Sequence, residues 1–445
     1  MHPEASSHVI FGWSAAWVSS VLFCIVYGLI ISEKINRAVV GLAGAGLLIL
    51  CGVLTQEAAL RGIDFNTIGL LLGMMLIVGI TSKSGIFQYV AIWSAKAVNA
   101  APVGVLIMLS LVTAVLSALL DNVTTVLLIV PVTLAITEEL GVKAYPYLIN
   151  EVLFSNIGGT ATLIGDPPNI MIGSAVGLTF MDFVIHAGPA VLLVMVLTIL
   201  PMYWIWRKDL VATPEAQQRV MCFNEREAIK DSRLLKQALG VLAGVIAGFV
   251  VAHHFHIAPA TISMFGAAVL LLLDNFGRSA DDQSKNVHHA FSEVEWITLM
   301  FFVGLFILVH GLEASGVIRA LAEQLLAVTG GDQKITALGI LWGSALLSGV
   351  IDNIPFVATM IPLIKSLAPV FGGEQELMKF WWALSLGACL GGNGTLVGAS
   401  ANLVVAGLAE RAGQPIRFWD YTKSCFPLML LSIAVCHLYL QLRYL

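Results

Sequence analysis

The chain has 445 residues and a formal net charge of −5, and 58% of its residues are hydrophobic while only 11% are charged. This composition leaves too little polar surface to cover a soluble globule of this size, so it excludes an ordinary soluble domain. A membrane-crossing helix needs about 20 apolar residues, and we count ten such stretches. The apolar runs are continuous, which argues against a barrel of alternating strands. We therefore expect an all-α integral membrane protein.

Several function classes are disfavoured by what the sequence lacks. The six cysteines have no CxxC spacing and predict no disulfide framework. The cluster His253-His254-Phe255-His256 is more typical of a solvated loop than of a metal centre, and the histidine or cysteine triads of metalloenzymes are missing. No basic cluster indicates a nucleic-acid partner. The sequence has no GxxxxGK[ST] loop, so it predicts no ATP-hydrolysing domain in this chain. We therefore expect neither an enzyme nor a cofactor-binding protein.

Taken in chain order, the apolar runs form two sets of six, separated by the most polar segment. The first set lies at about 13–31, 38–54, 65–81, 102–137, 147–176 and 186–206, and the second at about 236–252, 259–273, 295–312, 335–370, 378–408 and 424–441. We divide the chain accordingly into a first repeat at 1–206, a cytoplasmic linker at 207–235 and a second repeat at 236–445.

The two sets are related as an internal repeat. Asp121-Asn122 interrupts the fourth run of the first set, and Asp352-Asn353 interrupts the fourth run of the second, at a shift of 231 residues. A Gly-rich break follows in each half, at residues 158–169 and 391–402. Each repeat therefore contains one run broken at an acid-amide pair and one helix broken by glycines.

The acid-amide breaks could lie within continuous crossings or at the tips of re-entrant hairpins, and the lysines and arginines discriminate between the two. With hairpins at 102–137 and 335–370 and both termini outside, 17 of the 23 lysines and arginines fall inside, as the positive-inside rule expects. Each half then crosses five times, and this odd number inverts the second half relative to the first. Inverted repeats with interrupted helices are typical of secondary transporters, whose substrate site lies near the midplane.

The polar breaks predict a cavity. Within the hydrocarbon core of a membrane, unpaired backbone groups are tolerated only where they are buried in protein or lie beside water. Asp121 and Asp352 are candidate proton or cation sites, since a carboxylate within an apolar run is costly. Alternatively, each caps the helix that follows it. Asn122 and Asn353 are candidate ligands or, alternatively, caps of the hairpin tips.

Asp166 lies between Gly165 and two prolines that stop the helix. Its repeat position is Ala399, so the halves differ in acidity at this break. We expect Asp166 to be a coupling site, and the alternative is a capping residue at a structural kink. The other candidate solute or ion ligands are polar side chains near the same breaks, any of which could instead satisfy freed backbone groups. They are Thr125, Asn156, Thr162, Asn169, Asn393, Thr395 and Asn402.

Two further side chains have competing interpretations. Glu151 lies near the start of its apolar run, where it is either a functional acid or a side chain that reaches back to the membrane interface. Cys389 stands at the repeat position of Asn156, where a thiol could meet trivalent arsenic, a soft partner for a soft ligand. The alternative for Cys389 is a small apolar filler.

The strings at the first pair of breaks carry a family resemblance. They are Asp121-Asn122-Val123-Thr124-Thr125 and the run from Ser155 to Asn169, which includes Gly165-Asp166-Pro167-Pro168-Asn169. Over essentially its full length the chain resembles the ion transporter superfamily, specifically its ArsB/NhaD branch of arsenite-efflux permeases, sodium/proton antiporters and relatives of the melanosomal P protein. The resemblance implies that the hairpin tips and broken helices form a transport domain that moves like an elevator against a scaffold.

The resulting hypothesis is export of arsenite or antimonite across a bacterial inner membrane, coupled to protons at Asp121, Asp166 or Asp352. The runner-up is sodium/proton exchange. It is favoured because the candidate site has three carboxylates and few soft ligands such as thiols. Further alternatives are transport of an anion or small carboxylate, a membrane enzyme and a membrane scaffold. The resemblance to arsenite permeases adds a cytoplasmic ATPase as a candidate partner at the linker, and exposed apolar surface leaves a homodimer open.

Overall fold

Every regular element in the described part of the chain is a helix, which confirms the all-α prediction. The computed structural model describes residues 9–32, 34–255 and 257–445. Within them, seven helices are long and apolar enough to cross a membrane, or eight if the bent pair α9–α10 counts as one span. Three shorter apolar helices, α1, α2 and α14, add to these. The chain therefore has the architecture of a multi-pass membrane protein.

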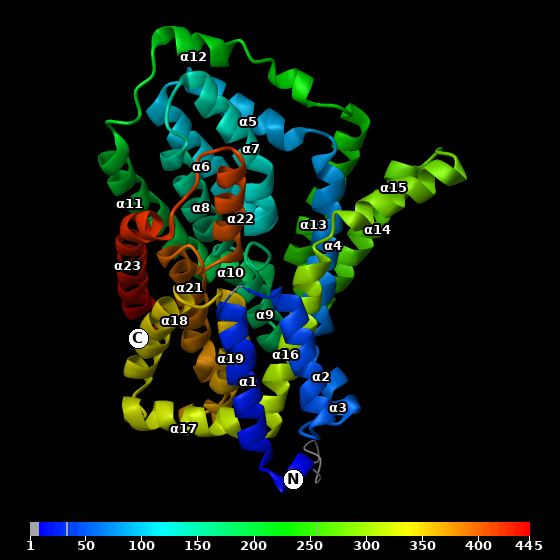
Figure 1. Cartoon of the computed structure of the whole chain (residues 1–445), viewed down its shortest axis with the longest axis vertical. Helices are drawn as coiled ribbons and strands as arrows, with labels where there is room; N and C mark the ends of the chain where they lie inside the picture. The colour runs from blue at the N-terminus through cyan, green and yellow to red at the C-terminus, as the bar shows by residue number, and fades with distance from the viewer. Residues whose placement is uncertain (1–8, 33, 256) are drawn as a thin grey trace.

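The helices follow one another as Figure 1 shows, from blue to red. Those before the polar linker are α1 (Ala15–Ile31), α2 (Arg37–Leu50), α3 (Gln56–Arg61), α4 (Phe65–Ser82), α5 (Ile86–Ala97), α6 (Pro102–Leu119), α7 (Asn122–Leu140), α8 (Tyr145–Gly159), α9 (Pro167–Val176), α10 (Phe180–His186) and α11 (Gly188–Trp206). The linker contains α12 (Pro214–Met221). After it come α13 (Ser232–Phe255), α14 (Pro259–Asn275), α15 (Ala280–Ser292), α16 (Trp296–Ala314), α17 (Val317–Thr329), α18 (Gln333–Ser348), α19 (Asn353–Ser366), α20 (Ala368–Phe371), α21 (Met378–Gly391), α22 (Ser400–Arg411) and α23 (Phe418–Arg443).

The chain doubles back at both acid-amide breaks. Helix α6 ends at Leu119 and α7 begins at Asn122, and the two helices pack on each other and on α5. Helices α18 and α19 are separated by residues 349–352 and both pack on α17. Because Asp121 and Asp352 each cap the helix that follows, a new helix starts at the same point in both halves. The predicted hairpins are therefore helix–turn–helix pairs, and their re-entry into a membrane stays a prediction.

Each doubled-back pair packs closely against the broken helix of its own half. Helix α6 crosses α8 at Gly158, where a Cβ would clash with the carbonyl oxygen of Ala114, and Ser117 Oγ donates to the Ser155 carbonyl at 2.6 Å. The α18–α21 crossing has the same construction: a Cβ on Gly391 would lie 2.5 Å from the Ala345 carbonyl oxygen. Small residues thus allow the backbones to approach closely, as they do in many membrane bundles.

Gly158→Ala should therefore destabilise the protein, whereas Gly407→Ala should not. The added methyl at Gly158 has no room and forces α6 from α8, at a cost of about 1–3 kcal/mol. A Cβ on Gly407, inside α22, meets no atom within 4 Å, so alanine there should gain roughly 0.5 kcal/mol or more of helix stability. Thermal unfolding of the detergent-solubilised variants measures both changes, and equal melting temperatures would contradict the close crossing.

The two halves of the chain interlock. Helix α2 packs on α16, α4 on α14, and α7 on α22, while α9 lies against α19 and α21. Figure 1 shows α2, α4, α13, α14 and α16 on one side of the molecule and α6, α8, α11, α18, α21 and α23 on the other. The breaks from which the candidate site is built belong to α7 and α9 of the first half and to α19 and α22 of the second.

The polar segment between the halves rests on helices of the first half. Ion pairs join Lys96 to Glu225 at 2.6 Å, Lys143 to Asp209 at 2.8 Å, and Arg219 to Glu139 at 3.1 Å. The hydrogen bond from the Lys96 ammonium lowers the pKa of the Glu225 carboxyl. The segment is thus docked over the end of the molecule where α5 lies and α7 ends.

Candidate functional site

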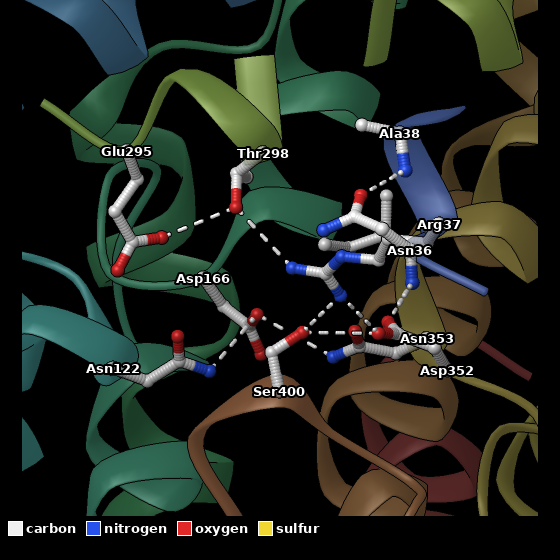
Figure 2. Close-up of polar contacts among 11 residues, drawn as sticks. Asn36, Arg37, Ala38, Asn122, Asp166, Glu295, Thr298, Asp352, Asn353 and Ser400 are labelled. Carbon is white, nitrogen blue, oxygen red and sulfur yellow. Dashed lines mark hydrogen bonds and ion pairs between the residues drawn. The ribbon is translucent and has the colours of Figure 1, made fainter. Parts of the chain in front are cut away.

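The tips of both doubled-back pairs meet at Asp166. Asn122, the first residue of α7, donates from Nδ2 to Asp166 Oδ1 at 3.3 Å, and Asn353, the first residue of α19, donates from Nδ2 to the same oxygen at 3.4 Å. Figure 2 shows both amides directed at this carboxyl. Asp166 is fully buried. The structure therefore brings together three predicted site residues from positions 231 residues apart and from the break between α8 and α9.

The Asp166 side chain does not cap α9, although Asp166 directly precedes that helix. Its backbone is extended, with φ of −143°, and its side chain accepts no capping hydrogen bond. Pro167 and Pro168 explain this, because they have no backbone N–H to offer, and the N–H of Asn169 bonds to the Asp166 carbonyl instead. Among the described residues, Asp166 Oδ2 has no hydrogen-bond partner. One carboxyl oxygen is thus available for a proton or a cation.

A chain of buried amides extends from this carboxyl. Asn122 Nδ2 also donates to Asn156 Oδ1 at 3.0 Å. Asn156 Nδ2 in turn donates to Asn393 Oδ1 at 2.9 Å and to Asn402 Oδ1 at 3.0 Å. The predicted ligands of the first and second breaks therefore form one connected network across the two halves.

Two of the predicted asparagines hold the broken backbone in place. Asn169 Nδ2 donates to the carbonyls of Thr160 at 3.1 Å and Thr162 at 2.9 Å. Asn402 Nδ2 donates to the carbonyls of Gly392 and Thr395, both at 2.9 Å. Their amide donors satisfy backbone freed by the breaks, which was the alternative to a ligand role.

The threonines of the two breaks make matching contacts with the hairpins. Thr162 Oγ1 donates to the Ala118 carbonyl at 2.6 Å, and Thr395 Oγ1 donates to the Gly349 carbonyl at 2.6 Å. Each bond joins a Gly-rich break to the end of the helix before the hairpin tip. Thr125 is different: it is fully buried, and its Oγ1 has no partner in the described part of the structure.

The two other predicted acids have different environments from Asp166. Asp121 caps α7, accepting from Thr124 N at 2.8 Å and from Thr124 Oγ1 at 2.5 Å. Asp352 caps α19 by accepting from Ile354 N at 3.1 Å. The capping interpretation of both residues thus has direct support in the geometry, and it does not exclude a second role.

Arg37 is a site residue that the sequence reasoning missed. Its Nη1 donates to Asp352 Oδ2 at 2.9 Å and to Ser400 Oγ at 2.6 Å, and its Nη2 donates to Thr298 Oγ1 at 3.2 Å (Figure 2). The guanidinium also lies over the Phe301 ring. No local motif marks its partner Asp352, which lies 315 residues away in the sequence.

A cavity of about 300 Å³ adjoins this ion pair. Its polar lining is Asn36, Arg37, Asp352 and Ser400, and the rest of its wall is aliphatic. Ser400 is the first residue of α22 and donates to Asp352 Oδ2 at 3.0 Å. The N-termini of α7, α9 and α19 thus meet at Asp166, and that of α22 adjoins them, so four positive helix ends converge.

Cys389 lies beside the amide network and is not exposed to solvent. It is fully buried, and its thiol donates to Asn169 Oδ1 at 3.5 Å. The same oxygen accepts from Ser385 Oγ at 2.7 Å. Within residues 9–32, 34–255 and 257–445, no group of three or more histidine, cysteine, aspartate or glutamate side chains could hold a metal ion.

Comparison with known proteins identifies the family. Residues 27–387 match the family model described as citrate transporter, CitMHS. The chain belongs to the CitMHS citrate transporter family. It is therefore a membrane transporter, in agreement with the transport function predicted from the sequence. The narrower ArsB/NhaD assignment stays a prediction.

Several relatives cover almost the whole chain. An uncharacterized transporter of Mycobacterium tuberculosis is 44% identical over 431 residues, which is 96% of this chain and 98% of the relative. The P protein of Mus musculus is 34% identical over 496 residues, covering 93% of this chain but only 59% of that protein. The YdaH transporter of Alcanivorax borkumensis has a similar fold, with a TM-score of 0.53 at 14% identity, over 97% of this chain and 99% of that chain.

Proposed function

We propose that the chain is a secondary active transporter that couples solute movement to a proton bound by Asp166. The observation that carries this proposal is the bonding of that carboxyl: two amides donate to one oxygen, and the other oxygen has no partner among the described residues. No described lysine, arginine or histidine forms an ion pair with it. A carboxylate buried without a countercharge costs several kcal/mol. Asp166 therefore carries a proton or another cation while it is enclosed.

For the solute we propose a small oxyacid, with arsenite or antimonite first. Neutral trihydroxyarsenic needs hydrogen-bond donors and acceptors rather than a countercharge, and the buried centre is made of amides. Asn122 Oδ1 and Asn393 Nδ2, an acceptor and a donor, have no partners in the part of the chain that is described. The buried Cys389 thiol, which is bonded to Asn169, takes no part in this proposal.

A small carboxylate is the second candidate solute. Helix N-termini favour anionic groups, and four of them converge on this site. The family description, citrate transporter, favours the same class. Sodium/proton exchange remains the alternative in which the unpartnered oxygens of Asp166, Asn122 and Thr125 would serve as cation ligands.

For the orientation we keep the sequence-based proposal. The linker at 207–235 lies in the cytoplasm and both termini lie outside, across a bacterial inner membrane. The hairpins and broken helices move as a unit against the other helices. The candidate protein partners are a second copy of this chain and a cytoplasmic ATPase bound to the linker.

Flux into reconstituted vesicles tests the function. The full chain is assayed with a panel of arsenite, antimonite, citrate, sodium and lithium while a pH-sensitive dye reports the proton gradient. We expect accumulation of arsenite or antimonite that collapses when the proton gradient is removed. Citrate accumulation alone would select the second candidate. A sodium-stimulated collapse of the proton gradient without uptake of any oxyacid would reject both in favour of sodium/proton exchange.

A further inference from the structure

Glu151 is a second enclosed carboxyl that the proposed function does not use. It lies in the middle of α8, and its side chain is fully buried. Thr133 of α7 donates a short hydrogen bond to Glu151 Oε1, while Glu151 Oε2 has no partner among the described residues. An ionised carboxylate would be costly in such a setting. Glu151 therefore carries a proton in the conformation described here.

No described lysine, arginine or histidine forms an ion pair with Glu151. Helix α8 packs against α6, α7, α11, α21 and α22. Those neighbouring helices carry several ionisable side chains. They are Glu138 and Glu139 on α7, Tyr203 on α11, Lys379 and Cys389 on α21, and Glu410 and Arg411 on α22.

A row of polar side chains on α7 leads from Glu151 toward Asp166. Thr125 follows Asn122 by three residues and Thr133 follows Thr125 by eight, so Thr125 and Thr133 lie close to one and three helical turns from Asn122 and share one face of α7 with it. The distance along the helix from Asn122 to Thr133 is about 16 Å. All three side chains are buried. This face of α7 therefore has a polar group at each end, one that binds Asp166 and one that binds Glu151, with apolar residues at 126–132 between Thr125 and Thr133.

Helix α8 carries polar side chains between Glu151 and Asn156, a stretch of about 8 Å along the helix. Ser155 follows Glu151 by one turn, and Asn156 is bonded to Asn122. At the Asp166 end of this interface, Thr125 Oγ1 and Asn122 Oδ1 have no hydrogen-bond partners in the described chain. Hydroxyl and amide groups of this kind can hold and pass a proton between two carboxyls, with or without bridging water.

We propose that Glu151 is a second proton-binding site, on a path along the α7–α8 interface between Asp166 and the end of the molecule covered by the linker. The inference rests on the proposed function. Glu151, which is protonated in this conformation, first releases its proton to water at the linker end, where α7 terminates near the Arg219–Glu139 ion pair. The resulting carboxylate then takes up a proton that leaves the Asp166 carboxyl, so one O–H bond breaks and one forms.

Glu151→Gln tests the proposal, because glutamine has the shape of the protonated acid and can still accept from Thr133 but cannot release a proton. In reconstituted vesicles, exchange of labelled arsenite or citrate across the membrane should stay within about twofold of the parent, since exchange needs no proton release. Proton-driven accumulation of the same solute should fall at least tenfold. Parent-like accumulation by Glu151→Gln would overturn the proposal and leave a structural acid.

Two further variants keep the result interpretable. Glu138→Gln removes an exposed carboxyl near the end of α7 and should leave both assays unchanged. Thr133→Val removes the donor to Glu151 and should shift the pH dependence of accumulation; a superimposable pH profile would count against the path, even if Glu151→Gln failed to fold. If the parent itself showed no proton dependence, the proposed function would fail instead, so the two failures are distinguishable.

Discussion

Asp166→Asn should abolish proton-driven accumulation of solute while leaving the protein folded. Among the described acids at the breaks, Asp166 is the one whose carboxyl neither caps a helix nor pairs with a base, and the variant removes that carboxyl. Its side-chain oxygen can still accept from Asn122 and Asn353, so the contact between the tips survives. We expect accumulation in vesicles to fall to the level of vesicles without protein.

The matched control for this variant is Asp182→Asn. Asp182 lies in the first turn of α10, where its carboxylate accepts from Thr179 N at 2.7 Å as part of a capping box. Losing that charge should cost at most about 1 kcal/mol of stability and should not change accumulation. Parent-like proton coupling in Asp166→Asn, with this control also normal, would remove Asp166 from the mechanism.

Arg37→Met should lower the free energy of unfolding by about 2 kcal/mol. The Arg37–Asp352 pair is partly enclosed, with 24% and 15% of the two side chains exposed, so its loss should cost more than that of a surface pair and less than that of a fully buried one. Methionine keeps the apolar stem of the side chain but leaves Asp352 without its cationic partner. Chemical unfolding in detergent measures the change.

The double variant Arg37→Met/Asp352→Asn separates the charge pair from simple packing. Removing both charges leaves none uncompensated, so most of the lost stability should return. If the double variant is as unstable as the sum of the two single variants, the pair makes no specific contribution. Arg37 belongs to α2, and Asp352 belongs to the hairpin tip. The pair must therefore break if the tips move against α2 during transport.

The interrupted helices were predictable because their signals are local. An acid-amide pair between apolar runs, and glycines followed by two prolines, stop a helix wherever they occur. The structure places a helix end at each of these breaks, beside Asp121, Asp166 and Asp352. The all-α class followed from the composition and from the continuous apolar runs.

The different environments of the three acids could not be predicted from the sequence, because they depend on which hydrogen-bond donors the fold brings near each carboxyl. Asp121 accepts from Thr124, three residues away, and this local contact is the capping interpretation that the sequence predicted as an alternative. Asp352 contacts Arg37, which is 315 residues away in the sequence, and no local pattern predicts that contact. Asp166 finds two amides from opposite halves. Glu151 was ambiguous from sequence because its burial depends on how α7, α8 and their neighbours pack.

The interlocking of the halves has a consequence for biosynthesis. Helix α2 leaves the ribosome long before α16, and α4 long before α14, yet each is packed against that later partner in the finished protein. Until the second half is inserted, the first must wait in the bilayer with these surfaces facing lipid or the insertion machinery. A nascent chain truncated at residue 235 should therefore be a substrate for membrane quality-control proteases rather than a stable half-protein.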